Sequence, residues 1–219
     1  MLIYQMPISL YSFKLRLALK LKGLTIPLRD PPGGSYKTPA FRAINPAGTI
    51  PVLIDGDLMI SECEAIIEYL EDAKLGDPLF PVDIRARARM RMLSRWHDLQ
   101  LEPALRRLFA HVAPEARDSQ AVADIDHSIA GKLDLVEQAM HPAGPFSLGP
   151  EPYLPDCGLT ASLLWLEALT AQLGLKAAPG PRLTRVLAAM TRHARATDEI
   201  AEYRGLLATW VGSKLAQTS

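Results

Sequence analysis

The sequence predicts two structural regions, a small α/β domain followed by an all-helical domain. Up to about Asp72, short apolar runs typical of strands alternate with segments of helical periodicity. From Asp83 onward the strand patterns end, and Ala-, Leu- and Arg-rich helical periodicity continues to near the carboxyl end. A stretch dense in Gly and Pro, Lys74 to Pro81, separates the two patterns. We therefore expect one domain over residues 1–73, a linker, and a second domain over residues 83–219.

The elements of the first region are expected in a fixed order. They are a strand at Leu2–Met6, a helix at Ser12–Lys22, a strand at Thr25–Arg29, a helix at Pro39–Ile44, two strands at Val52–Ile54 and Leu58–Ile60, and a helix ending at Asp72. This order suits a sheet with parallel strands and an antiparallel edge pair, which is the arrangement of thioredoxin-like domains.

The last strand pair and the helix after it carry the clearest local signals. Asp55-Gly56 favours a tight turn between the two strands, because glycine accepts positive φ. Ser61 and Glu64 have the spacing of a capping box, in which each side chain accepts a backbone N–H of the other residue. The pattern predicts a hairpin that leads directly into a capped helix.

Pro51 stands where the first strand of this hairpin begins, and proline is tolerated only at the start or edge of a strand. X-Pro bonds adopt the cis isomer at low cost. If the Ile50-Pro51 bond is cis, the N–H and C=O of Ile50 turn away from the sheet and can pair with a bound peptide. The helix that begins at Glu62 offers unpaired N–H groups, which bind carboxylates. Recognition of a peptide and of a carboxylate is therefore expected in one place.

In the second region the longest helical pattern runs from about Asp83 to Val112, with Pro103 expected to kink it. Its expected buried positions are Met92, Trp96, Leu99, Leu105 and Leu108. Cys157–Leu173 is the most uniformly apolar segment, so we expect it to form the core of this domain.

Composition excludes several classes of function. The chain has 219 residues, 48% of them hydrophobic, and 24 basic against 24 acidic side chains. It has no apolar run long enough to cross a bilayer, and its amino terminus lacks the pattern of a signal peptide. Four arginines at positions 85, 87, 89 and 91 spread around a helix, so nucleic-acid binding is not expected. Cys63 and Cys157 are far apart, and no His or Cys spacing indicates a metal site, so we expect a cytoplasmic protein without a metal.

Pro51 before a strand and the pair Glu62-Cys63 at a helix start resemble the cytosolic glutathione S-transferase superfamily, whose members have a cis-proline and a Glu/Gln-Ser pair there. The resemblance implies a thioredoxin-like domain that binds glutathione and a helical domain that forms the second-substrate pocket. It implies that Ile50 holds the cysteinyl backbone and that Glu62 and the helix start hold the γ-glutamyl end. Cys63 replaces the serine, and its S–H is a weak donor, so backbone N–H groups must carry that contact. Tyr36 and Lys37 are candidates for binding the glycyl carboxylate, although an exposed lysine is also simply solvated surface.

Ser9-Leu-Tyr-Ser12 occupies the place of the redox C-x-x-C motif, so disulfide cycling is excluded there. Counting back from Gly23 at the end of the first helix, Ser9 falls on the residue that family members use to activate the thiol. A hydrogen bond to a charged group contributes about 1.5 to 3 kcal/mol, which lowers a thiol pKa near 8.5 by roughly one to two units. Tyr11 is the competing donor, whereas Tyr4 is expected to point into the sheet and Ser12 is expected to cap the helix.

Within the superfamily the first helix is similar to the zeta class, which isomerises maleylacetoacetate. Zeta members have Ser-Ser-Cys where this chain has Ser9-Leu10-Tyr11, and Ala168 stands where they carry a substrate-binding arginine, so both departures argue against that reaction. Gly149 and Asp156 match a family motif that opens the core helix, and Asp156 is expected to bond back to the helix start. Trp96, His97 and Asp98 are candidates for the wall of the second-substrate pocket, with a packed tryptophan and a surface histidine as the alternative.

The resemblance therefore implies a glutathione transferase of serine type that adds glutathione to a small electrophile, a detoxification activity, in a cytosolic homodimer with no nucleic-acid or membrane partner. Two alternatives stay open. One is a glutathione-dependent isomerase, which uses the same thiolate, and the other is a non-catalytic interaction protein with this fold. A reductive dehalogenase is disfavoured, because neither cysteine lies in the Ser9 loop.

Overall fold

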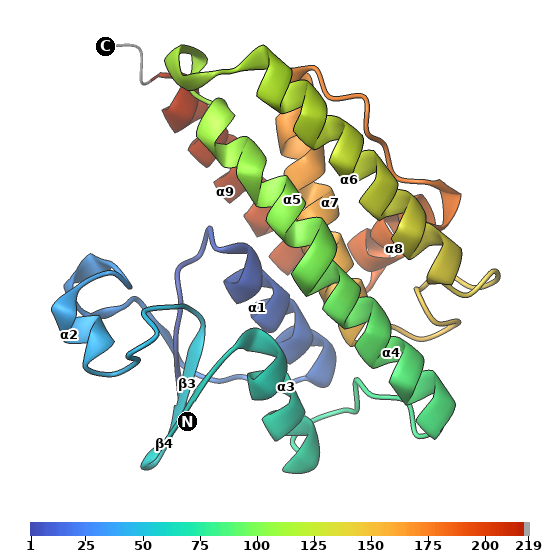
Figure 1. Ribbon diagram of the computed structural model, residues 1–219. Helices are drawn as coiled ribbons and strands as arrows, with labels where there is room; N and C mark the ends of the chain where they lie inside the picture. Colours follow the sequence, from blue (N-terminus) through green and yellow to red (C-terminus); the bar gives the residue numbers. More distant parts are fainter. Residues whose placement is uncertain (217–219) are drawn as a thin grey trace. The chain divides into compact units, whose positions relative to one another are not determined.

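The computed structural model describes residues 1–216, and its contacts cluster into two compact units, whose boundary in the sequence lies between Leu79 and Phe80. Figure 1 shows a sheet with helices in the first unit, coloured blue to teal, and helices throughout the second. The expected combination of a thioredoxin-like α/β region and an all-helical region is confirmed.

The first unit is built on a four-stranded mixed sheet in the order β2-β1-β3-β4. The strands are β1 Leu2–Tyr4, β2 Leu28–Arg29, β3 Val52–Asp55 and β4 Leu58–Ser61. β1 and β2 are parallel, whereas β3 is antiparallel to both β1 and β4. The hairpin register pairs Asp55 with Leu58, and Gly56 between them has a φ of 61°, as the turn prediction requires.

The helices of this unit are α1 Leu10–Lys22, the short 3₁₀ turn η1 Pro32–Gly34, α2 Pro39–Arg42 and α3 Cys63–Asp72. Figure 1 shows α1 and α3 on one side of the β3-β4 hairpin and α2 on the other. On the α2 side, the buried ring of Phe41 packs edge-on against Tyr4 at 6.0 Å between ring centroids. The sheet is therefore covered on both faces.

Two ion pairs join α1 to α3. Lys14 Nζ contacts Glu64 Oε1, and Lys22 Nζ lies 2.7 Å from Glu71 Oε1. From the first pair to the second, the residue numbers rise in both helices. α1 and α3 therefore run parallel, and their amino termini lie at the same end of the sheet. Both amino termini carry the positive end of a helix dipole.

Two predictions about helix starts were wrong. Ser61 pairs with Val52 in β4 instead of capping α3, and the Glu64 carboxylate contacts Lys14, so no capping box forms. Glu62 takes the N-cap position of α3, and its side chain makes no capping bond among residues 1–216. In α1 the N-cap is Ser9 instead of Ser12. At α3 the local capping signal failed because Ser61 is paired in the sheet and Glu64 forms an ion pair with the buried Lys14.

In the second unit, the helices before the core helix are α4 Ile84–Trp96, the π-turn η2 His97–Leu101, α5 Glu102–Arg106, the 3₁₀ turns η3 Arg107–His111 and η4 Pro114–Ala116, and α6 Ser119–Ala139. The later helices are α7 Leu154–Leu173, α8 Pro181–Arg192 and α9 Thr197–Leu215. α7 packs against α4, α5, α8 and α9, and all of its residues from Leu154 to Leu166 are buried. The prediction that Cys157–Leu173 forms the core of this region is confirmed.

Pro103 does perturb the long helix, through the π-turn just before it. The N–H of Glu102 bonds to the carbonyl of His97. A π-turn supplies an i→i+5 pattern where proline cannot continue the regular ladder. The buried stripe of α4 and η2 follows Met90, Leu93, Ser94, His97 and Leu101. Met92 and Leu99 lie off this stripe with 37% and 59% exposure, so their predicted burial was wrong, whereas Leu105 and Leu108 are buried as expected.

Asp156 holds the start of α7 from inside the unit. Its two carboxylate oxygens accept the N–H groups of Ser147 and Tyr153, each at 2.8 Å, and the residue has no exposed surface. The expectation that Asp156 bonds back to the helix start is confirmed. Burial raises the pKa of this carboxyl group from its ordinary value to about 6, against the opposing effect of the two backbone donors.

Over the described residues, no helix combines the length and apolar character that a membrane span needs.

Candidate functional site

The register of the sheet brings the predicted site residues to one edge. Tyr4 pairs with Val52 on one side and with Arg29 on the other, and Val52 pairs with Ser61. β1, β2 and β4 all end at this row, and β3 begins there. The four segments that leave or enter the sheet at this edge contain every residue predicted to bind or activate glutathione: Ser9, Tyr36, Lys37, Ile50, Pro51, Glu62 and Cys63.

The segment before β3 has the predicted backbone geometry, because the Ile50-Pro51 peptide bond is cis. Within residues 1–216, neither the N–H nor the C=O of Ile50 is hydrogen-bonded. Asn45, which is only 1% exposed, holds the preceding loop, since its side-chain amide donates to the carbonyl of Thr49 at 2.9 Å and accepts the N–H of Ala47 at 3.2 Å. The N–H and C=O of Ile50 are therefore unpaired polar groups, next to a loop that Asn45 holds.

The segment after β4 turns sharply into α3. Glu62 has a φ of 73° and a ψ of 119°, a backbone conformation that residues other than glycine rarely adopt. Such positions cost on the order of 1–3 kcal/mol and cluster at ligand-binding sites. The side chain of Glu62 is exposed, whereas that of Cys63 is buried, with 4% exposure of the residue. The start of α3 therefore offers a carboxylate and backbone N–H groups, and the Cys63 thiol lies in the interior.

Ser9 lies at the amino end of α1. Its Oγ accepts the N–H of Ser12 at 3.4 Å, and the residue is partly exposed. A hydroxyl that accepts one hydrogen bond keeps its own hydrogen to donate, so capping and thiol activation are compatible. Ser12 is fully buried, and its Oγ accepts the N–H of Met6 at 3.4 Å, so this hydroxyl has an internal partner.

The two competing tyrosines differ in their surroundings. Tyr4 lies in β1 with its ring against Phe41, which fits the expectation that it points into the sheet. Tyr11 is partly exposed and lies in the first turn of α1, two residues after Ser9. Ser9 and Tyr11 therefore both stay candidates for the thiol-activating donor.

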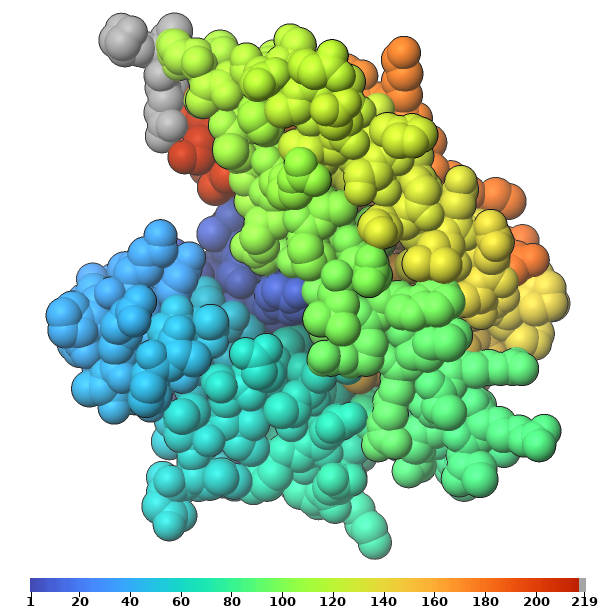
Figure 2. Space-filling view, viewed as in Figure 1, coloured from blue at the N-terminus to red at the C-terminus, as the bar shows by residue number. Residues whose placement is uncertain are grey.

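Tyr36 and Lys37 lie in the loop that leads from β2 to α2, ahead of the N-cap residue Thr38. Lys37 is exposed, and its Nζ lies 5.9 Å from the centroid of the Tyr36 ring. Figure 2 shows that this part of the chain, in blue, forms an open surface of the first unit. A carboxylate could reach this ammonium group without displacing a buried side chain.

Three residues that support this edge were missed by the sequence patterns. The guanidinium of Arg16 donates to Gln5 Oε1 at 2.7 Å and to the carbonyl of Pro7 at 3.0 Å, and so fixes the loop before Ser9. Lys14 and Asn45 are also buried polar residues. The sequence could have indicated these residues only by their position among apolar neighbours, because polar and charged side chains are rarely buried there unless they have a partner.

In the helical unit the predicted surface histidine is wrong, because His97 has no exposed surface. Its Nδ1 lies 2.7 Å from Asp98 Oδ1, and its Nε2 lies 2.8 Å from Ser162 Oγ. Gly158 lies so close to the ring that a Cβ there would stand 2.8 Å from Nδ1. Because His97 and Ser162 are buried, this Ser-His-Asp arrangement is a packing network instead of a nucleophilic site.

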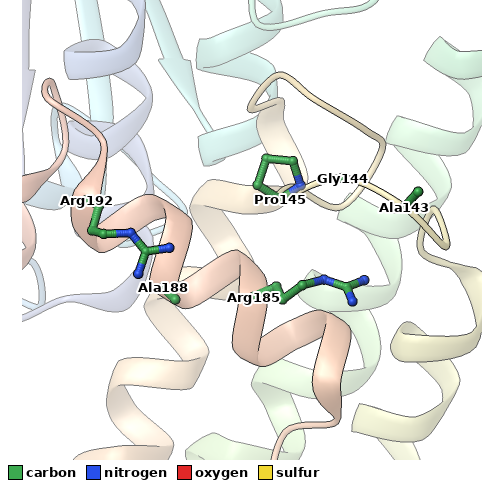
Figure 3. Close-up of a pocket in the computed structure, with 6 residues that line it drawn as sticks. All are labelled: Ala143, Gly144, Pro145, Arg185, Ala188 and Arg192. Atoms are coloured by element: carbon green, nitrogen blue, oxygen red, sulfur yellow. The ribbon is translucent and has the colours of Figure 1, made fainter.

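A pocket of about 340 Å³ opens on the helical unit between α8 and the loop at residues 143–145 (Figure 3). Arg185, Ala188 and Arg192 line it from α8, and none of the predicted site residues takes part. Over the described residues, no group of three His, Cys, Asp or Glu side chains is arranged to hold a metal ion.

Comparison with known proteins agrees with this geometry. Residues 3–78 match the family model described as glutathione S-transferase, N-terminal domain. The chain is 30% identical to glutathione S-transferase Z2 of Arabidopsis thaliana over 194 residues, which are 83% of this chain and 85% of that protein. It is 31% identical to maleylacetoacetate isomerase of Pseudomonas aeruginosa over 192 residues, which are 81% of this chain and 85% of that protein.

Among solved structures, a bacterial maleyl pyruvate isomerase, described as a zeta-class glutathione S-transferase, is similar with a TM-score of 0.74 and 27% identity. That likeness covers 93% of this chain and 98% of the other. The edge of the sheet with a cis-proline and two helix amino termini, together with relatives that span most of the chain, leads to one conclusion: this protein belongs to the glutathione S-transferase family, with a relationship to its zeta class.

Proposed function

We propose that this protein binds reduced glutathione along the edge defined by Tyr4, Val52 and Ser61, ionises its thiol at Ser9 and transfers the sulfur to a small electrophile. The observation that carries the proposal is that the unpaired N–H and C=O of Ile50 and the amino termini of the parallel helices α1 and α3 lie at the same end of the sheet. A peptide strand needs backbone partners, a carboxylate needs N–H groups, and a thiolate needs a nearby positive potential. This edge offers all three.

Glutathione is proposed to bind in extended form. The cysteinyl backbone pairs with the N–H and C=O of Ile50 beside Pro51. The γ-glutamyl group has both an ammonium and a carboxylate, which suits the exposed Glu62 side chain and the N–H groups of Cys63 and the first turn of α3. Lys37, with Tyr36 beside it, is available to the glycyl carboxylate.

Thiol activation at Ser9 needs no general base. The Ser9 hydroxyl donates to the sulfur, and the amino end of α1 adds a positive potential, so both favour the thiolate over the thiol. Together they lower the thiol pKa by roughly one to two units. The thiolate then forms a bond to the electrophilic carbon, and either a leaving group departs as an anion or the product takes up a proton.

A second candidate reaction is isomerisation of a conjugated cis double bond. Two of the proteins to which the chain is similar are named as isomerases, which favours this reaction. The thiolate would add to the double bond, the resulting single bond would rotate, and the sulfur would leave again, so glutathione is regenerated. Leu10 and Tyr11 in place of Ser-Cys, and Ala168 in place of arginine, favour transfer over this reaction.

The arrangement around the reaction is also a proposal. Residues 1–73 would bind glutathione, and residues 83–219 would contribute the second-substrate pocket, with Trp96 as a candidate wall residue. The family relationship supports a cytoplasmic homodimer that detoxifies small electrophiles. Size-exclusion chromatography with light scattering checks the dimer.

The proposal is tested by following conjugation of a chloro-nitroaromatic with wild-type protein and the Ser9→Ala and Tyr11→Phe variants. Loss of most activity in Ser9→Ala alone supports Ser9 as the activating donor, and loss in Tyr11→Phe alone assigns the role to Tyr11. Turnover of maleylacetoacetate with glutathione recovered unchanged would instead favour the isomerase. Absence of glutathione binding would remove the enzymatic proposal and leave an interaction protein.

A further inference from the structure

Two ion pairs between α1 and α3 have the same chemistry and nearly the same burial. The Lys14 side chain has no exposed surface and that of its partner Glu64 is 13% exposed, whereas the Lys22 and Glu71 side chains are 1% and 11% exposed. A buried charge is costly unless it is paired, so each lysine fixes the carboxylate that it contacts. The two pairs therefore form a matched set within one unit.

The pairs lie at opposite ends of the two helices. Lys14 and Lys22 are eight residues apart in α1, which is about 12 Å along a helix. The Lys22-Glu71 pair lies away from the proposed site: Lys22 also donates to the carbonyl of Asp77 at 2.9 Å, and Glu71 also accepts the N–H of Leu79 at 2.6 Å. This second pair ties down the chain that leaves α3.

The Lys14-Glu64 pair lies toward the amino ends of α1 and α3, near both Ser9, proposed to activate the thiol, and Glu62, proposed to bind the γ-glutamyl group. Lys14 is five residues after Ser9, and Glu64 is two residues after Glu62. Glu62 has a strained φ of 73°, and such a conformation persists only where the surroundings hold both sides of it. On one side Ser61 is paired with Val52 in the sheet. On the other side Glu64, in the first turn of α3, is held by Lys14.

We propose that Lys14 is a positioning residue for glutathione binding, acting through Glu64. It fixes the first turn of α3, and with it Glu62, relative to the Ser9 end of α1, so that the γ-glutamyl group and the sulfur are held at a set spacing. This inference rests on the proposed function, because it assigns a role in the same glutathione site. Lys14 does not touch glutathione, and the sulfur chemistry stays with Ser9.

The proposal predicts an effect on glutathione binding that the matched pair lacks. In Lys14→Met, the KM for glutathione rises about tenfold to hundredfold, because a displaced α3 start weakens its hydrogen bonds to the γ-glutamyl carboxylate, and a lost hydrogen bond to a charged group has an effect of about that size. The kcat at saturating glutathione changes less than about threefold, because the thiol-activating residue is unchanged. Lys14→Met and Lys22→Met each leave a buried carboxylate without its cation, so the melting temperature falls by a similar amount in both. In Lys22→Met, however, the KM for glutathione stays within about twofold of wild type. Lys14→Arg keeps the cation and restores most of the binding.

Steady-state kinetics and calorimetric titration with reduced glutathione measure these effects. Equal KM values in Lys14→Met and Lys22→Met would overturn the positioning role while leaving the proposed function intact. If Lys14→Met does not fold, Glu64→Gln decides, because it removes the charge and keeps the size of the side chain. A raised KM in that variant supports the proposal, and an unchanged KM overturns it. Wild-type protein that binds no glutathione contradicts the proposed function itself.

Discussion

Ser9 and Ser12 share one hydrogen bond across the first turn of α1, with the Oγ of Ser9 as acceptor and the N–H of Ser12 as donor at 3.4 Å. The bond leaves the hydroxyl hydrogen of Ser9 available to a sulfur atom. It also gives Ser9 a structural role that a simple truncation would remove together with the chemistry. Variants at this position must therefore separate the two roles.

Ser9→Asp makes that separation. Aspartate is as good an N-cap residue as serine, so the free energy of unfolding stays within about 0.5 kcal/mol of wild type. An ionised aspartate carboxylate has no hydrogen to donate and repels a thiolate, so the rate of conjugation falls about tenfold to hundredfold. Ser9→Ala loses the cap, at about 1 kcal/mol, as well as the activity. Chemical denaturation and conjugation assays check both, and an active Ser9→Asp variant would remove Ser9 from the mechanism.

Glu62→Gly separates backbone strain from ligand binding. Glycine adopts a φ of 73° without steric cost, so the free energy of unfolding is unchanged or rises by up to about 1 kcal/mol. The KM for glutathione rises, because the carboxylate proposed to meet the γ-glutamyl ammonium is gone. Lys74→Gly is the matched control, since Lys74 has a φ of 55° outside the predicted site. That variant should show the same stability effect with unchanged KM. A raised KM in both would indicate a general effect of glycine.

The buried carboxyl of Asp156 predicts an unusual pH dependence of stability. Its folded-state pKa of about 6 lies above the ordinary value of 3.8, so between these values the folded protein binds a proton that the unfolded chain does not. The contribution of this group to the free energy of unfolding therefore falls as pH rises through this window, by up to about 3 kcal/mol.

Asp156→Asn isolates that contribution. The amide has one oxygen for the two N–H donors, so the variant is less stable, and its deficit relative to wild type shrinks as pH rises from about 4 to about 6. Urea denaturation of both proteins at several pH values measures the deficit. A deficit that grows over this range would contradict the account, and glutathione affinity is expected to be the same in both proteins.

The His97 network predicts a stability effect without an effect on the glutathione site. Gly158→Ala places a Cβ 2.8 Å from the imidazole and should cost about 1–3 kcal/mol of unfolding free energy through overpacking. Ser162→Ala leaves His97 Nε2 without its partner at a similar cost. Thermal melts measure the loss. An unchanged melting temperature in both variants would contradict the structural role, and glutathione affinity should match wild type.

The sequence was most informative where several local signals agreed. Asp55-Gly56 favours a tight turn on its own, so the hairpin could be predicted from local signals, whereas Pro51 only permits a cis bond and the resemblance to the family was needed to expect one. The cap of α1 could not, because Ser9 and Ser12 lie within one turn and either can serve as N-cap. The prediction of a capping box at Ser61 was wrong because Ser61 pairs with Val52 in the sheet and Glu64 pairs with Lys14. Neither of these partners is adjacent in sequence to the residue it contacts.

Buried polar residues were the main source of error. Lys14, Ser94 and His97 occupy buried positions that a periodicity argument assigns to apolar side chains, whereas the apolar Met92 and Leu99 lie outside the buried stripe. Each buried polar group depends on a particular partner, such as Glu64 or Ser162, that only the folded chain supplies. A single sequence can indicate that a buried polar residue needs a partner, but it cannot identify which residue that partner is.

The most direct test of the central claim is a pH titration of the ultraviolet thiolate absorbance of glutathione bound to wild-type protein and to Ser9→Asp. We expect a bound thiol pKa roughly one to two units below the ordinary value near 8.5 in wild type, and no such depression in the variant. A bound thiol with an ordinary pKa in the wild-type protein, or an equally depressed pKa in both proteins, would contradict that claim.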